Sequence, residues 1–93
     1  MLDFRTESIS GEPYVYRPLG EYVVQARGVC GGRPTFKYTR IEITGTLARL
    51  ASGESLEQLV QGYAGKVSRE AVLEANEIMT REFLSHLPSL QIA

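Results

Sequence analysis

The chain has 93 residues and a formal net charge of −1, with 43% hydrophobic and 23% charged residues, an ordinary globular composition for one domain. No apolar run approaches the roughly 20 residues of a membrane span, and the first five residues do not resemble a secretory signal, so we expect a cytoplasmic protein that meets no membrane. Because Cys30 is the only cysteine and His86 the only histidine, an internal disulfide and any multi-cysteine or histidine metal cluster are excluded.

The first 26 residues are expected to form an N-terminal segment built on a β-hairpin. Residues 1–12 show no strong pattern and indicate a loose tail or a short edge element. Residues 14–17 and 21–25 are both β-prone, and a Pro-Leu-Gly sequence between them supplies the turn. A two-stranded hairpin is marginal in water, so this one must pack on helices, pair with the strand predicted over residues 39–43 or pair with a second copy.

A glycine-rich loop and a short extended segment follow in residues 27–43. Gly31 and Gly32 permit left-handed backbone, and Pro34 disfavours helix at the residue before it, so this part is predicted to be a defined turn. Residues 39–43 alternate as a half-buried strand does. The prediction is a loop that runs into a short strand.

Positive charge is concentrated in the middle of the chain. The window 27–49 holds five basic side chains against Glu42 alone, a net charge of +4, whereas residues 51–93 have a net charge of −3. If the protein binds a polyanion, this window is where we expect the contact. The alternative is a solvated basic face that balances the acidic second half of the same chain.

Two short helices are predicted next. Residues 44–46 can cap the first, whose apolar side chains follow at spacings of three and four, and Gly53 is placed to end it. Ser55 begins the second helix, with Gln58 three residues later as the other half of a capping box, and Gly62 and Gly65 bracket the expected end of this helix.

The third predicted helix is the longest, from its cap at Ser68 to Leu87. Val72, Met79 and Phe83 lie on one apolar stripe, which neighbouring side chains widen beyond what two short helices can cover. We therefore expect this stripe to form the seam of a homodimer.

Three helices joined by short turns are typical of a helix-turn-helix domain, in which the third would be the recognition helix. That helix is rich in acids, and Glu74 and Glu77, three residues apart, are expected on a solvated charged face. Acidic helices fit a phosphate-lined groove poorly. The pattern therefore leaves open a helix-turn-helix fold that serves protein interaction alone.

Five segments carry a resemblance to a known family. They are residues 28–37, 39–41, 53–59, Tyr63 and residues 68–72. Together they resemble the DUF433 family over about residues 27–88. The resemblance implies a homeodomain-like helix-turn-helix fold. It also implies the antitoxin half of a bacterial or archaeal toxin-antitoxin pair, whose toxin is usually a PIN-like ribonuclease.

The expected fold is therefore mainly α. A homeodomain-like three-helix domain over residues 27–93 is preceded by the segment 1–26, with its β-hairpin, and by a short strand, all within one compact domain. Two features depart from the family pattern. Tyr38 stands where the family usually has Gly, so it is either strained or the turn is remodelled. The turn before the third helix lacks the usual Asp and Pro.

Two groups of candidate site residues follow. The candidate nucleic-acid contacts are Arg33, Lys37, Arg40, Arg49 and Arg69. The candidate contacts with a partner or a second copy are Tyr14, Tyr16, Tyr22, Val72, Met79 and Phe83. Each has a structural alternative: an arginine beside Gly and Thr can tie a loop to a carboxylate, and tyrosines can form the core of a hairpin.

No arrangement of residues indicates catalysis or a cofactor, since one histidine and one cysteine supply neither a catalytic triad nor a metal set. We expect a non-enzymatic, antitoxin-like homodimer that binds operator DNA, a PIN-like ribonuclease toxin, or both. The alternative is a dimerisation and protein-interaction module of helix-turn-helix fold that does not bind DNA.

Overall fold

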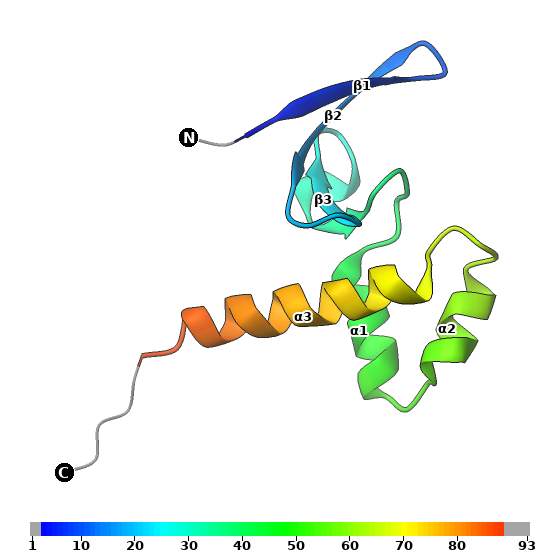
Figure 1. Cartoon of the computed structure of the whole chain (residues 1–93), viewed down its shortest axis with the longest axis vertical. Coiled ribbons are helices and arrows are strands. Elements are labelled where there is room, and N and C mark those ends of the chain that lie inside the picture. The colour runs from blue at the N-terminus through cyan, green and yellow to red at the C-terminus, as the bar shows by residue number, and fades with distance from the viewer. Residues whose placement is uncertain (1–2, 89–93) are drawn as a thin grey trace.

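The computed structural model describes residues 3–88, which form a four-stranded antiparallel sheet followed by three helices (Figure 1). The strands are β1 (Arg5–Ile9), β2 (Glu12–Pro18), β3 (Val23–Ala26) and β4 (Thr35–Phe36). The helices are α1 (Ile43–Ala51), α2 (Leu56–Gly62) and α3 (Arg69–Ser85), and a 3-10 turn at Cys30–Gly32 lies between β3 and β4. The predicted order of a β-hairpin followed by three helices is confirmed.

The sheet has the strand order β1-β2-β3-β4. The predicted hairpin is formed by β2 and β3, with Arg17 opposite Gln25. Of the two expectations for the first residues, the edge element is correct, because β1 pairs with β2 along its whole length. Ser10 and Gly11 join these two strands, and both have positive φ, 51° and 81°, which suits the twist of a two-residue hairpin loop.

The strand predicted over residues 39–43 is reduced to one antiparallel bridge, between Glu42 and Thr35. The chain turns after β4 because Thr39 donates twice to the carbonyl of Phe36, from its N–H at 3.0 Å and from its hydroxyl at 2.8 Å. The same hydroxyl accepts from the N–H of Ile41 at 3.0 Å. The alternating residues therefore belong to a turn that leads directly into α1 at Ile43, whose side chain is fully buried.

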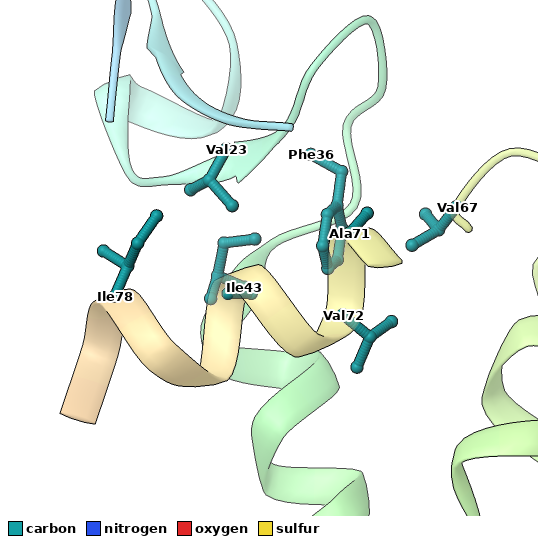
Figure 2. Packing of buried hydrophobic residues seen from close by; sticks show 8 residues of the cluster. Val23, Phe36, Ile43, Val67, Ala71, Val72 and Ile78 are labelled. Carbon is teal, nitrogen blue, oxygen red and sulfur yellow. The ribbon is translucent and has the colours of Figure 1, made fainter. Parts of the chain in front are cut away.

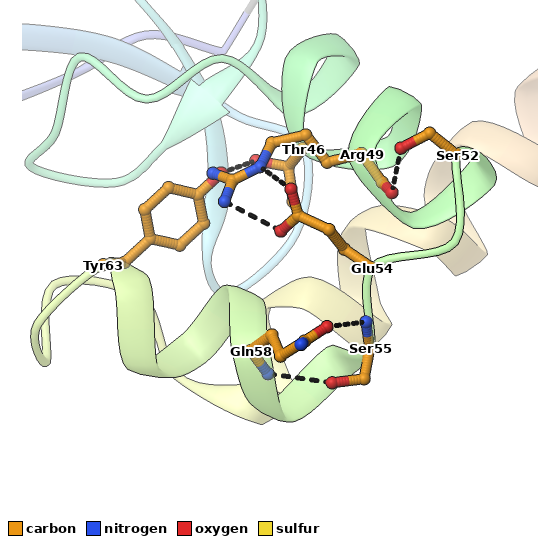
Figure 3. Close-up of polar contacts among 7 residues, drawn as sticks. All are labelled: Thr46, Arg49, Ser52, Glu54, Ser55, Gln58 and Tyr63. Atoms are coloured by element: carbon orange, nitrogen blue, oxygen red, sulfur yellow. Dashed lines mark hydrogen bonds and ion pairs between the residues drawn. The ribbon is translucent and has the colours of Figure 1, made fainter.

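The predicted cap of α1 at residues 44–46 is also wrong, since the helix already begins one residue earlier, at Ile43. Glu42 takes the N-cap position without a side-chain cap bond. The Thr46 hydroxyl instead donates within the helix to the carbonyl of Glu42 at 3.3 Å. It also lies 2.7 Å from the Tyr63 hydroxyl, within hydrogen-bond distance (Figure 3). Thr46 thus fastens α1 to the end of α2.

The caps predicted for α2 and α3 are confirmed. The Ser55 hydroxyl accepts the N–H of Gln58 at 3.1 Å, and the Gln58 side chain accepts the N–H of Ser55 at 2.9 Å (Figure 3). Ser68 caps α3 by accepting the N–H of Ala71 at 3.1 Å. The helix α2 ends at Gly62, within the predicted bracket of Gly62 and Gly65.

The main core lies where α3 passes between the sheet and α1 (Figures 1 and 2). Its buried side chains come from β3, β4, α1, α3 and the turn before α3: Val23, Phe36, Ile43, Val67, Ala71, Val72, Ala75 and Ile78. A smaller cluster of Tyr16, Val24 and Ala26 lies within the sheet. Of the supports expected for the hairpin, packing on the helices is therefore confirmed through Val23.

Glu74 joins α3 to the loop between β2 and β3. Its carboxylate accepts the backbone N–H groups of Glu21, Tyr22 and Val23 at 3.0, 2.8 and 3.2 Å. A Cβ at Gly20 would lie 2.5 Å from the Glu74 carboxylate, so glycine permits this close approach. The expectation that Glu74 lies on a solvated face is wrong, whereas Glu77 is exposed as expected.

Candidate nucleic-acid interface

Arg33 is held by a carboxylate of its own chain. Its guanidinium donates to both oxygens of Glu42, at 2.7 and 3.3 Å, and this lowers the pKa of Glu42 below its ordinary value. Since Glu42 occupies the N-cap position of α1, the pair ties the loop after β3 to the start of that helix. The geometry therefore supports the alternative role for Arg33, in which it ties a loop to a carboxylate of its own chain.

Arg49 and Arg69 tie helices together in the same way. The Arg49 guanidinium donates to both oxygens of Glu54, at 3.0 and 2.8 Å, and lies 5.4 Å from the ring centre of Tyr63 (Figure 3). Arg69 at the start of α3 pairs with Glu57 of α2. Both arginines thus neutralise acids of the helical part.

Lys37 lies among aromatic rings and Glu7 of β1. Its ammonium is 3.3 Å from the Glu7 carboxylate and 4.8 and 4.9 Å from the ring centres of Tyr16 and Tyr38. The hydroxyls of both tyrosines donate to the same carboxylate, that of Tyr38 at 2.7 Å. We call Glu7, Tyr14, Tyr16, Lys37 and Tyr38 the Lys37 cluster.

The charges of this cluster stabilise one another. Donation by Tyr16, then by Tyr38, lowers the pKa of Glu7, and Lys37 adds to that effect. Burial alone would lower the pKa of Lys37, but its contacts with Tyr16, Tyr38 and Glu7 outweigh burial, so that this pKa is raised. Lys37 therefore stays cationic across the physiological range.

Two basic side chains beside Lys37 are better placed for a ligand. A cleft of about 580 Å³ is lined by Lys37, Tyr38, Thr39, Arg40, Ile41 and Lys66. A second cleft of about 440 Å³ shares Lys37, Tyr38 and Lys66 and extends to Ser68 and Ala71 at the start of α3, with Glu21 on its wall. Within residues 3–88, no carboxylate lies within ion-pair distance of Arg40 or Lys66.

This pair of clefts, named here the Lys37–Lys66 cleft, can bind an anion. Three cations converge on it, and the positive end of the α3 dipole lies beside it. Of the predicted contacts, the structure brings Lys37 and Arg40 together here, and it places Arg33, Arg49 and Arg69 in ion pairs.

Lys66 was missing from the predicted contacts. It lies in the turn before α3, where Ala64 and Gly65 both have positive φ, 53° and 83°. The only sequence signal was a positive charge just ahead of a helix start. Its proximity to Lys37 arises from packing between segments that are far apart in the chain.

The predicted partner contacts are divided between the interior and the surface. Tyr16 and Val72 are buried in this chain's own core, and Tyr22 packs against it. Met79 is half-buried, and Phe83 exposes 65% of its surface.

Neither a metal cluster nor a membrane span is found in the part of the chain that the structure describes. Within residues 3–88, no three acidic, histidine or cysteine side chains gather as metal ligands would. No helix among these residues has the length and apolar character needed to cross a bilayer.

A comparison of the sequence with known protein families identifies one family that matches this chain. The family described as "Protein of unknown function (DUF433)" matches residues 23–77, more than half of the chain. The chain belongs to the DUF433 family. The resemblance predicted over residues 27–88 is thereby confirmed over residues 27–77, with the match beginning in β3 and ending within α3. Neither the curated proteins nor the solved structures that were searched include a match to this DUF433 chain.

The matched region of this DUF433 protein contains Lys37, Arg40 and Lys66, but neither Glu7 nor Phe83. Tyr38, where the family pattern usually has Gly, has a positive φ of 68°. Of the two alternatives expected for Tyr38, a strained backbone is therefore the one observed.

Proposed function

We propose that this DUF433 protein is the antitoxin-like component of a toxin-antitoxin system. It acts by binding: two copies bind operator DNA through the Lys37–Lys66 cleft, and the complex sequesters a PIN-like ribonuclease toxin. The observation that supports the DNA contact is that Lys37, Arg40 and Lys66 line one cleft at the start of α3. The toxin comes from the family resemblance alone.

The basic side chains that line the cleft are suited to phosphate contacts. Arg40 and Lys66 are exposed and free of ion pairs within the described residues, so binding a phosphate breaks no existing pair. Backbone phosphates position a protein on DNA, and lysine and arginine supply most such contacts. The exposed side of α3 is a poorer candidate, because Glu70 and Glu77 lie on it.

A second function is favoured by a different observation. Arg33, Arg49 and Arg69 all neutralise carboxylates of the same chain. A protein with so few free cations could serve as a dimerisation and protein-interaction module without DNA binding.

The salt dependence of binding separates the two functions. If three cations per copy contact phosphates, a dimer neutralises about six, and the affinity for its own upstream DNA should fall with a log-log slope of about −5 as salt rises. Replacing Arg40 and Lys66 by Ala leaves about two contacts per dimer and should reduce the slope to about −2. Fluorescence anisotropy with a labelled duplex at several salt concentrations measures it.

A matched control removes the same charge elsewhere. The double variant Arg5→Ala with Arg27→Ala changes two exposed arginines that do not line the cleft and should keep the slope of the unchanged protein. Absence of binding at low salt, or equal slopes for the two double variants, would rule out the cleft as the DNA site.

A further inference from the structure

The C-terminal half of α3 leaves the body of the protein (Figure 1). The buried residues of this helix are Ala71, Val72, Ala75 and Ile78. Every residue over 80–88 is exposed, and these include Phe83 at 65%, Leu84 at 60% and Leu87 at 52%. A protruding helix end is normally polar, so three large apolar side chains here need a partner surface.

These side chains form a second apolar stripe on α3. Successive helical residues are about 100° apart, which places Leu73 and Leu84 roughly 170° from the mean direction of the buried side chains of the same helix. Leu87 lies roughly 130° from that direction, and Phe83, at the edge of the open side, roughly 90° from it. Leu73 exposes 50% of its surface, although it lies beside the core. One stripe of α3 therefore serves the core, and the other remains open from Leu73 to Leu87.

A shallow groove lies along the body-side half of the same helix. Its volume is about 380 Å³, and its apolar lining includes Leu19, Leu73 and Ile78. The acids Glu70, Glu74 and Glu77 and the base Arg81 line its rim. One helix thus carries an apolar protrusion at its C-terminal end and an apolar groove nearer its N-terminal end.

We infer that a second copy of this chain covers the open stripe, with the two α3 helices antiparallel. A two-fold axis near Thr80 sets Leu87 of one copy opposite Leu73 of the other, and it brings Phe83 and Leu84 over the groove. Both copies complete both contacts at once, as an isologous interface requires. A foreign partner would fill the groove or cover the protrusion, whereas a second copy does both with the same helix.

The exposed apolar area is large enough for an interface with a second copy. Four side chains that expose half or more of their surface present roughly 400 Å² of apolar surface per copy. Together with the groove rim and Met79, the contact approaches the roughly 800 Å² per partner of a standard interface. This pairing deepens the proposed dimer and relocates its seam, because Val72 belongs to the core and Leu73, Leu84 and Leu87 replace it.

The oligomeric state without DNA tests the pairing. Phe83→Ser with Leu84→Ser changes side chains that are exposed in one copy, so the fold should persist while the dimer dissociation constant rises roughly 100-fold in sedimentation equilibrium. The control, Phe4→Ser with Ile9→Ser, removes two exposed apolar side chains from the N-terminal part and should leave the dissociation constant unchanged.

Disulfide crosslinking tests whether the two α3 helices are antiparallel. In a Cys30→Ser background, Leu73→Cys mixed with Leu87→Cys should form disulfide-linked dimers, whereas either variant alone should not. A monomer at micromolar concentration would contradict the pairing. So would a dimer whose dissociation constant is unchanged by Phe83→Ser with Leu84→Ser, or a disulfide between two copies of the Leu87→Cys variant. Because DNA is absent, such a failure is distinct from a failure of the DNA-binding variants.

Discussion

Tyr38 is held in a left-handed conformation that costs a tyrosine about 1–2 kcal/mol. Its contacts offset this cost. The Tyr38 N–H donates to the Tyr14 hydroxyl at 3.0 Å, its ring lies 5.5 Å from that of Tyr14, and its hydroxyl bonds Glu7. The same tyrosine lines the Lys37–Lys66 cleft. The residue that departs from the family pattern thus connects the N-terminal hairpin to the candidate interface.

In the proposed DNA complex, Glu7 would compete with a phosphate for Lys37. Glu7→Gln removes the negative charge 3.3 Å from the Lys37 ammonium, so the affinity for DNA should rise by up to about fivefold at low salt, as expected for a partly exposed ion pair. Anisotropy titrations of the two proteins against the same duplex measure this. A reduced or unchanged affinity would show that Lys37 does not face the phosphates.

Acid unfolding independently tests the contacts of the Glu7 carboxylate. Because the pKa of Glu7 is lowered in the folded protein, its contribution to stability is present above its ordinary value of 4.5 and is lost as the pH falls through the lowered pKa. Glu7→Gln should therefore weaken the dependence of the unfolding midpoint on pH below 4.5.

At the scale of the elements, Glu74 is the polar link between α3 and the sheet. Glu74→Gln replaces one of the two accepting oxygens by an NH₂ group, so at least one of the three backbone N–H groups loses its acceptor. We expect a loss of about 1–3 kcal/mol in the free energy of unfolding, measured by urea denaturation.

Glu77→Gln is the matched control. Glu77 lies one turn further along α3, is exposed and pairs loosely with Arg81 at 3.6 Å. Its substitution should change stability by less than about 0.5 kcal/mol. Equal effects of the two substitutions would contradict the role given to Glu74.

Elements with local signals were predictable from the sequence. The hairpin and the caps of α2 and α3 depend on residues close together in the chain, such as Ser55 and Gln58. The start of α1 was not predictable, because distant contacts fix it: Arg33 engages Glu42, and Ile43 donates to the carbonyl of Pro34 at 3.1 Å. The alternation over residues 39–43 indicated a strand because it resembles one locally.

For the whole molecule, the sequence located the basic region but not its geometry. Charge counting identified Lys37 and Arg40, yet it could not separate them from Arg33 and Arg49, whose carboxylate partners are visible only in the folded chain. Lys66 reaches the same cleft by tertiary packing. This cleft is separate from the apolar end of α3, so we propose that one helix has two surfaces, one for DNA and one for a second copy.

The central claim is that DNA contacts the Lys37–Lys66 cleft and not the exposed side of α3. Amide chemical-shift mapping by NMR, with a duplex of its own upstream DNA added to the labelled full chain at low salt, tests it most directly. If DNA contacts the cleft, the largest shifts should occur over residues 37–41 and 65–71. Shifts confined to residues 76–84, or no shifts at all, would contradict it.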